Sequence, residues 1–170
     1  MANTYTLIAS NTLTTTAASV TFSAIPATYD DLVLQLSARA DNTGLLLQMT
    51  LNSATSTYSN TLLLGNGATA TSSRNTGQAY LRAGYVNPSG STSSTFSSGE
   101  IYIPRYRSTT DKPMSSIGYT EDNATTAYIA NYANLWQTSS AITSITLDMA
   151  GSSQNFVSGS SFWLYGIKNT

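Results

Sequence analysis

Acidic side chains stand next to each other at two places in the chain, in Asp30-Asp31 and in Glu121-Asp122-Asn123. Each group lies in an expected loop beside an expected strand. Calcium takes six to eight oxygen ligands from acids, amides and carbonyls, so either group could contribute to a calcium site. Neither has the spacing of an EF-hand loop. The favoured alternative is that these acids form turns by accepting hydrogen bonds from nearby backbone N–H groups, and no metal or cofactor is predicted.

Two arginines, Arg105 and Arg107, flank Tyr106. On a strand, residues two apart share a face, so both could contact an acidic patch on a partner protein. The favoured alternative is a solvated strand end whose arginines pair with Glu100 or Asp111. Seven Lys and Arg against eight Asp and Glu give a net charge of −1. That balance provides no basic surface for a nucleic acid.

Aromatic side chains are frequent, with eleven Tyr, four Phe and two Trp. Tyr128, Tyr132 and Trp136 are spaced by four and would line one face of a strand. Exposed, they would suit sugar stacking or a subunit interface. The favoured alternative is that most of them fill a core between two sheets.

The chain contains no histidine and no cysteine. A Ser-His-Asp triad, a thiolate nucleophile and the commonest zinc ligand are therefore absent, and no G-x-S-x-G motif occurs. We predict that the protein is not an enzyme. No apolar stretch approaches the roughly 18–20 residues of a membrane span. The start, MANTYTLIAS, has no basic region followed by an apolar run, so we expect synthesis in a cytoplasm without a secretion signal.

Alternating apolar and polar residues, separated by turn residues, predict roughly ten short strands and an all-β sandwich or barrel. The expected strands before the C-terminal stretch are 5–9, 19–25, 29–40, 45–52, 61–64, 78–86, 99–106, 114–120 and 126–136. The polar segment 68–77 is expected to be a loop. Segment 127–135 could be a helix by propensity, but the surrounding pattern favours a strand. The turn residues 41–44 predict that 32–39 and 45–52 form an antiparallel hairpin.

The C-terminal stretch contains two further expected strands, Ile145–Met149 and Ser161–Ile167. The first alternates, whereas the second is apolar on both faces, with Phe162 and Trp163 on opposite sides. We expect the two strands to form the central pairing of the core. A strand apolar on both faces is either covered on both sides or lies against another chain. Phe162, Trp163 and Tyr165 are therefore candidate interface residues, together with the two arginines above.

Several segments carry a resemblance to a known family. They are TYTLIAS at 4–10, VTFSAIPATYDDLVLQLSARAD at 20–41, GEIYIPRY at 99–106, AITSITL at 141–147, NFVSGS at 155–160 and LYGI at 164–167. Over nearly its whole length the chain resembles small virion structural proteins of tailed bacteriophages. Such proteins include capsid decoration, tail and fibre proteins alike. The resemblance implies a jelly-roll-like fold.

We therefore expect residues 1–170 to form one domain, a jelly-roll-like antiparallel β-sandwich located in a virion. The first expectation is a capsid decoration (cement or knob) protein that binds the major capsid protein or tail proteins as a homo-oligomer, a trimer being favoured. The alternatives are a tail, fibre or baseplate component and a carbohydrate-binding module that recognises a host. A glycan binder should expose two or three aromatics in a groove beside polar groups, whereas a cement protein should expose a flat apolar edge. If attachment is apolar, Trp163→Ser should weaken oligomerisation or particle binding, whereas high salt should leave both unchanged.

Overall fold

The computed structural model describes residues 4–123, 127–151 and 153–169 and contains strands as its only regular elements there. The strands are β1 (Tyr5–Thr12), β2 (Ser19–Phe22), β3 (Asp31–Ala38), β4 (Leu46–Leu51), β5 (Tyr58–Gly65), β6 (Ala70–Gln78), β7 (Leu81–Tyr85), β8 (Ser97–Ile103), β9 (Lys112–Tyr119), β10 (Ile129–Trp136), β11 (Ile145–Met149) and β12 (Ser161–Ile167). The predicted fold class is confirmed: the strands form two antiparallel sheets packed as a jelly-roll-like sandwich.

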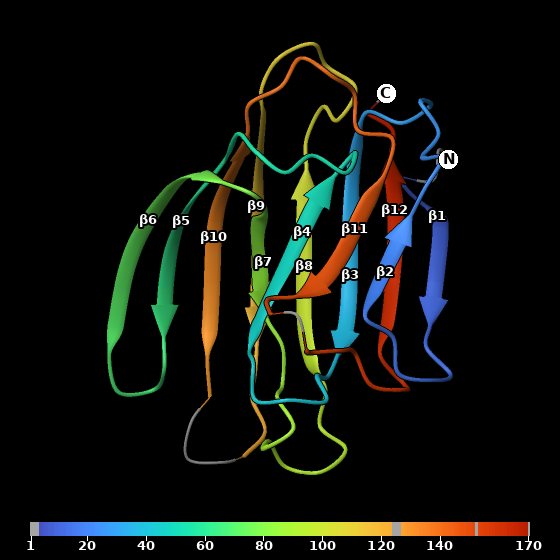
Figure 1. Ribbon diagram of the computed structural model, residues 1–170. Coiled ribbons are helices and arrows are strands. Elements are labelled where there is room, and N and C mark those ends of the chain that lie inside the picture. The colour runs from blue at the N-terminus through green and yellow to red at the C-terminus, as the bar shows by residue number, and fades with distance from the viewer. Residues whose placement is uncertain (1–3, 124–126, 152, 170) are drawn as a thin grey trace.

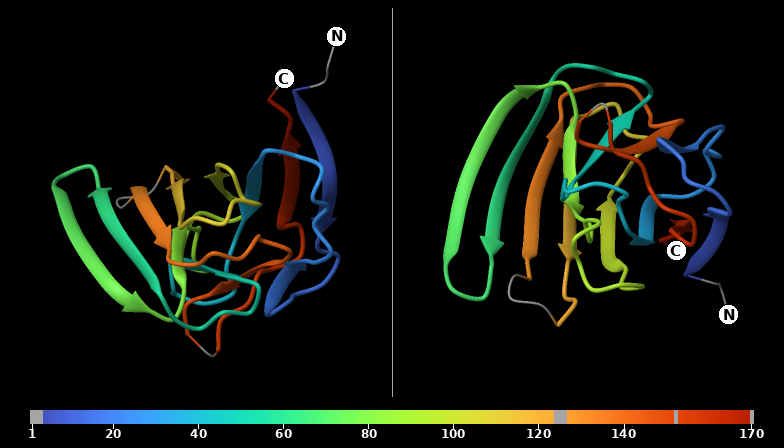
Figure 2. Two further views of the ribbon diagram at one scale, coloured as in Figure 1. Left: turned by 90° about the horizontal axis from the view of Figure 1, so that it is seen from above. Right: turned by 60° about the horizontal axis from the view of Figure 1, so that its bottom comes forward.

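The two sheets differ in size. The large sheet has eight strands in the order β1-β12-β3-β8-β9-β10-β5-β6, and the small sheet has four in the order β2-β11-β4-β7. Figure 1 shows the small sheet in front of the large one. The hairpin of β5 and β6 extends beyond the small sheet, as Figures 1 and 2 show from different sides.

The core lies between the sheets because each strand turns alternate side chains inward. From the large sheet, β3 contributes Leu32, Leu34 and Leu36, which are all buried. From the small sheet, β4 contributes Leu47, Met49 and Leu51, and β2 and β11 contribute the same kind of apolar row. We call the face of the large sheet that is turned away from the small sheet the outer face.

The predicted hairpin of 32–39 and 45–52 is wrong. β3 pairs with β12 and β8, whereas β4 pairs with β11 and β7 in the other sheet. The turn at 41–44 carries the chain from one sheet to the other. Asp41 at its start accepts hydrogen bonds from the backbone and side chain of Asn155 at 2.8 and 2.7 Å. The apolar rows of the two strands meet face to face across the core, which the local pattern cannot distinguish from lateral pairing.

The expected pairing of the two C-terminal strands is also wrong. β11 lies between β2 and β4 in the small sheet, and β12 lies between β1 and β3 in the large sheet. Phe156, in the connection between them, is buried and packs edge-on against Phe162 with ring centroids 5.0 Å apart. The connection therefore leads from the small sheet to the large one instead of forming a tight hairpin.

Two further expectations concern secondary structure. The segment predicted as a loop at 68–77 is mostly strand β6, which pairs with β5 at the edge of the large sheet. Its residues are almost all exposed, so no apolar alternation marks it in the sequence. The strand expected at 126–136 is β10, although residue 126 lies outside the described part of the chain. The helical alternative for 127–135 is wrong, because alternate residues of β10 are buried and exposed.

The two sheets converge where β7 approaches β9 and β10. Gly84 of β7 and Gly118 of β9 face each other there. A Cβ atom on Gly118 would lie 2.7 Å from the backbone nitrogen of Tyr85 and 3.1 Å from the Cα of Gly84. Packed sheets usually lie about 10 Å apart, so this approach depends on both residues lacking a side chain.

Candidate functional site

The acidic side chains of both groups accept hydrogen bonds from backbone N–H groups. Asp30 and Asp31 accept backbone N–H bonds from Asn169 and Arg105, each at 2.8 Å. In the second group, Glu121 accepts the backbone N–H of Asn123 at 2.8 Å, and Asp122 accepts that of Thr92 at 3.1 Å. Only the Glu121 contact, to a residue two positions further on, matches the turn-forming alternative. Asp30, Asp31 and Asp122 bond instead to backbone groups of segments distant in the sequence.

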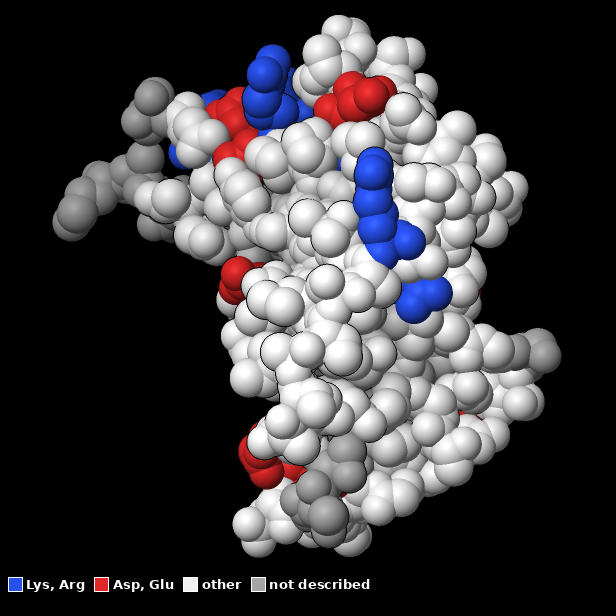
Figure 3. All heavy atoms as spheres, turned by 90° about the vertical axis from the view of Figure 1, so that its left-hand side faces the viewer, with Lys and Arg blue, Asp and Glu red and all other residues white. Residues whose placement is uncertain are grey.

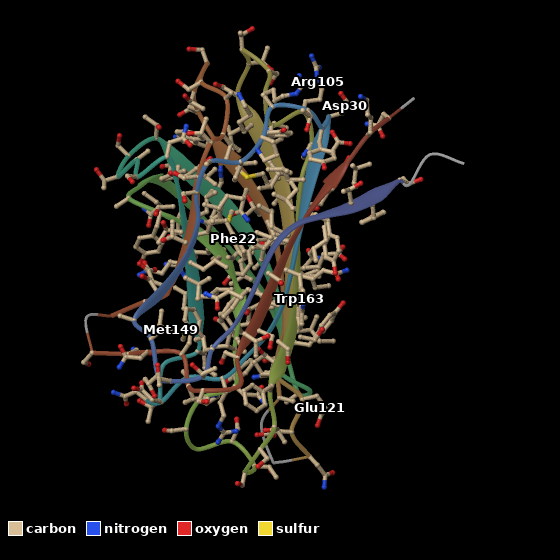
Figure 4. All side chains as sticks on the ribbon, turned by 90° about the vertical axis from the view of Figure 1, so that its right-hand side faces the viewer. Phe22, Asp30, Arg105, Glu121, Met149 and Trp163 are labelled. Carbon is tan, nitrogen blue, oxygen red and sulfur yellow. The ribbon has the colours of Figure 1, made fainter. Side chains whose placement is uncertain are left out.

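The acidic groups also lie apart from each other. Figure 4 shows Asp30 and Glu121 at opposite ends of the sandwich. The described residues contain no group of three or more His, Cys, Asp or Glu that could hold a metal ion.

The carboxyl group of Asp31 is held in place by several hydrogen bonds. Its burial favours the neutral form and would raise its pKa. The backbone N–H of Arg105, the amide of Asn169 and the hydroxyl of Tyr102 donate hydrogen bonds to it and together outweigh that effect, so the pKa of Asp31 is lowered. Asp31 is therefore an ionised anchor that fixes the end of β8 and the C-terminal segment.

The two arginines do not lie on a strand, because β8 ends at Ile103 before Pro104. Arg105 occupies a turn with a φ of 49°. Arg107 forms a salt bridge with Asp30 at 3.1 Å, so the predicted pairing with Glu100 or Asp111 is wrong. Both arginines are exposed. Figure 4 shows Arg105 at the same end of the sandwich as Asp30, the salt-bridge partner of Arg107.

Two of the three aromatic residues at 128, 132 and 136 belong to the interior. Tyr132 and Trp136 are buried, and Trp136 packs against Tyr58 with ring centroids 5.8 Å apart. Tyr128 is partly buried and contacts Tyr85 edge-on at 5.5 Å. The core-filling alternative is confirmed for Tyr132 and Trp136.

The candidate interface residues of β12 divide between the two faces of the large sheet. Phe162 is fully buried in the core, so the expectation that it is available to a neighbour is wrong. Trp163 and Tyr165 lie on the outer face and are only partly buried. Figure 4 shows Trp163 on the side of β12 opposite to Phe22 and Met149 of the small sheet.

The outer face collects the exposed apolar side chains. Among the described residues, five large hydrophobic side chains are exposed, and the strand register places all of them on this face. They are Tyr5, Leu7, Leu63, Tyr119 and Ile129. Leu7 is the register partner of Tyr165, and Tyr5 contacts Tyr165 edge-on at 6.2 Å. We call Tyr5, Leu7 and Tyr165 the edge patch, because β1 is the edge strand of the large sheet.

A groove of about 440 Å³ lies on the same face, between β12 and β9. Trp163 stands at one side, and Ile117 and Tyr119 stand at the other. Between them, Gln35 of β3 donates a hydrogen bond from Nε2 to Oε2 of Glu100 on β8 at 3.1 Å. We call this feature the groove. It combines aromatic, amide and carboxylate groups within one depression of the sheet.

Sequence reasoning identified only Trp163 among the groove residues. Gln35 was a visible signal, since it is the one polar side chain in the run Leu32–Val33–Leu34–Gln35–Leu36. The run is otherwise buried, and Gln35 is exposed. Glu100 and Tyr119 gave no comparable signal, because alternation in their own strands explains them fully.

Only 9% of the residues are charged. Figure 3 shows the side that carries β6, where most atoms belong to uncharged residues. No helix in the described ranges has the length and apolar character needed to cross a membrane.

Comparisons with known proteins identify no relative of this chain. No protein-family model matches the chain, and neither a curated protein nor a solved structure matches it.

Proposed function

We propose that the chain is a structural protein of a tailed-phage virion, made in the host cytoplasm, and in the first place a capsid decoration protein. The observation that carries the proposal is the edge patch. Tyr5 and Leu7 are 54% and 51% exposed on an edge strand whose outer backbone groups bond to no described strand. An exposed apolar edge is a ready site for contact with another chain.

Three features support this proposal. The sequence resembles such virion proteins over nearly its whole length, and the jelly-roll-like sandwich agrees with that resemblance. The near-neutral composition weakens repulsion between copies. The adjacent acids, Arg107 and the aromatics at 128–136 are used in backbone hydrogen bonds, a salt bridge and ring packing, which favours a binding protein over an enzyme.

The edge patch fits a second copy of the chain or the neighbouring shell subunit. Repeating one contact around a closed ring is the usual way to build a symmetric oligomer, and a trimer is the first choice. Full burial of one such side chain contributes about 1.5–3 kcal/mol. Repeated at each copy, this energy would strengthen a shell. A tail, fibre or baseplate position would use the same contact.

The test is sedimentation velocity on the native protein and on Leu7→Ser. We expect the native protein to sediment as an oligomer and the variant to shift toward the monomer. Leu63→Ser is the matched control, since Leu63 is 58% exposed at the opposite end of the same sheet. Immunogold labelling of virions should place the protein on the shell. A monomeric native protein that leaves virions unlabelled would refute the proposal.

A further inference from the structure

The groove has an aromatic side chain at each of its two sides. Trp163 comes from β12 and Tyr119 from β9, with β3 and β8 between them. Three strand spacings separate the two backbones by about 14 Å. The volume of the groove, about 440 Å³, falls within the roughly 300–1,000 Å³ typical of ligand sites. Tyr119 is 39% exposed, so an aromatic surface is open to solvent at this wall.

The floor is low because short side chains stand opposite each other. Ser37 of β3 and Ser98 of β8 are register partners. They line the groove beside the row that contains Gln35 and Glu100. A ligand can therefore approach the sheet closely and meet hydroxyl groups there.

The polar pair in the groove, Gln35 and Glu100, is held in one orientation and keeps acceptor atoms available to a ligand. Gln35 and Glu100 are register partners, and their hydrogen bond at 3.1 Å fixes the amide against the carboxylate. Oε1 of each side chain accepts no hydrogen bond from the described residues. Two neighbouring acceptors of this kind suit a ligand that offers adjacent hydroxyl donors.

Charge narrows the class of ligand. Among the described residues that line the groove, Glu100 is the only charged one, and no Lys or Arg is present. A nucleotide, a phosphate or an acidic sugar would be repelled by this carboxylate and would find no cation. The ligand should instead combine an apolar ring face for Trp163 or Tyr119 with uncharged hydroxyl groups.

We propose that the groove binds a neutral saccharide. One ring stacks on Trp163 or Tyr119 through its C–H face, and its hydroxyls donate to Glu100 and Gln35. This inference goes beyond attachment to the virion and uses a different part of the outer face from the edge patch. A virion protein with such a site would hold glycans of the host surface.

The first experiment uses tryptophan fluorescence. Trp136 is buried in the core, whereas Trp163 borders the groove, so a groove ligand should alter mainly the emission of Trp163. The probes are neutral oligosaccharides of glucose, galactose, mannose and N-acetylglucosamine, with sialyllactose and oligogalacturonate as acidic comparisons. Each is added up to about 10 mM, a range that includes weak single-site binding. We expect a saturable change with at least one neutral probe and none with the acidic ones.

Variants then locate the site by calorimetry with the probe that binds. We expect Trp163→Ala or Tyr119→Ala, and also Glu100→Gln, to weaken affinity by about tenfold or more. Leu63→Ala is the control, because Leu63 lies in the same register row but outside the groove, and it should leave affinity unchanged. Circular dichroism checks that each variant is folded. Glu100→Gln keeps the shape of the side chain and covers the case in which an aromatic variant fails to fold.

Several results would overturn the inference. They are the absence of a saturable response to every neutral probe, tighter binding of the acidic probes, or unchanged affinity in all three variants. A Trp163→Ala protein that lost oligomerisation but kept its affinity would assign Trp163 to subunit contact instead. Leu7→Ser should keep saccharide affinity, so failure of the edge-patch proposal and failure of this one are distinguishable.

Discussion

At the scale of single residues, neighbours on one strand serve different purposes. Phe162 and Trp163 are adjacent on β12, yet the first is fully buried and the second borders the groove. The pleat of the strand turns them to opposite faces. The apolar surplus of β12 is thus divided between the core and the outer face.

Two aspartates should influence stability in opposite directions. Burial raises the pKa of Asp148, although a hydrogen bond with Gln48 opposes the shift. The folded state therefore binds the proton of the Asp148 carboxyl group more tightly than the unfolded state does. Stability is lost as the pH rises through the folded pKa, because the buried carboxyl group must then ionise. We expect Asp148→Asn to raise the thermal midpoint at pH 7. The gain should disappear below a pH of about 3.9, where the native carboxyl is neutral.

Asp41 provides the contrast, because hydrogen bonds from Asn155 lower its pKa. The Asp41 carboxylate stabilises the folded state at pH values above its unfolded pKa, and this stabilisation is lost as the pH falls through its folded pKa. Asp41→Asn should lower the midpoint at pH 7, and the difference should shrink on acidification. Thermal melts between pH 3 and pH 7 measure both variants. Midpoint shifts of the same sign at pH 7 would contradict these assignments.

At the scale of elements, the approach of β7 to β9 closes one side of the sandwich. Gly118→Ala would place a Cβ atom 2.7 Å from the backbone nitrogen of Tyr85, and backbone atoms cannot move aside as a side chain can. We expect a loss of about 1–3 kcal/mol in unfolding free energy, typical of overpacking. Urea unfolding provides the measurement.

Gly65→Ala is the matched control for this prediction, because Gly65 ends β5 and a Cβ there would meet nothing within 4 Å. It should leave stability unchanged or raise it by up to about 1 kcal/mol, since alanine restricts the unfolded chain. Equal losses in the two variants would show that the sheets do not depend on close contact at Gly118.

At the scale of the whole molecule, apolar contact predicts that assembly tolerates salt. The net charge is −1 and the edge patch contains no charged group. At 1 M salt the screening length falls to about 3 Å, which weakens exposed ion pairs but not apolar contact. We expect the oligomer to persist in sedimentation runs from low salt to 1 M, and Arg107→Ala to leave it unchanged. Dissociation at moderate salt would instead implicate the end that carries Arg105 and Arg107.

The local pattern of the sequence was sufficient for most of the strands and for most side-chain directions. Alternation marked most of the strands, and it separated Phe162 from Trp163 correctly, because the pleat depends only on adjacent residues. It failed for β6, whose exposed polar residues leave no alternation to detect. Turn chemistry explained Glu121, whereas Asp30, Asp31 and Asp122 bond to backbone groups of segments distant in the sequence.

Only the tertiary structure decided which strands are neighbours. An apolar row on β3 packs equally well beside β4 or across from it, and the choice rests on contacts with β8, β11 and β12 that are distant in sequence. The groove follows from the same choice. Gln35, Glu100, Tyr119 and Trp163 lie on four strands, and the order β12-β3-β8-β9 together with its register brings them to one depression. No spacing within any one segment encodes that arrangement, because it arises from pairing between segments and not from the chemistry of each.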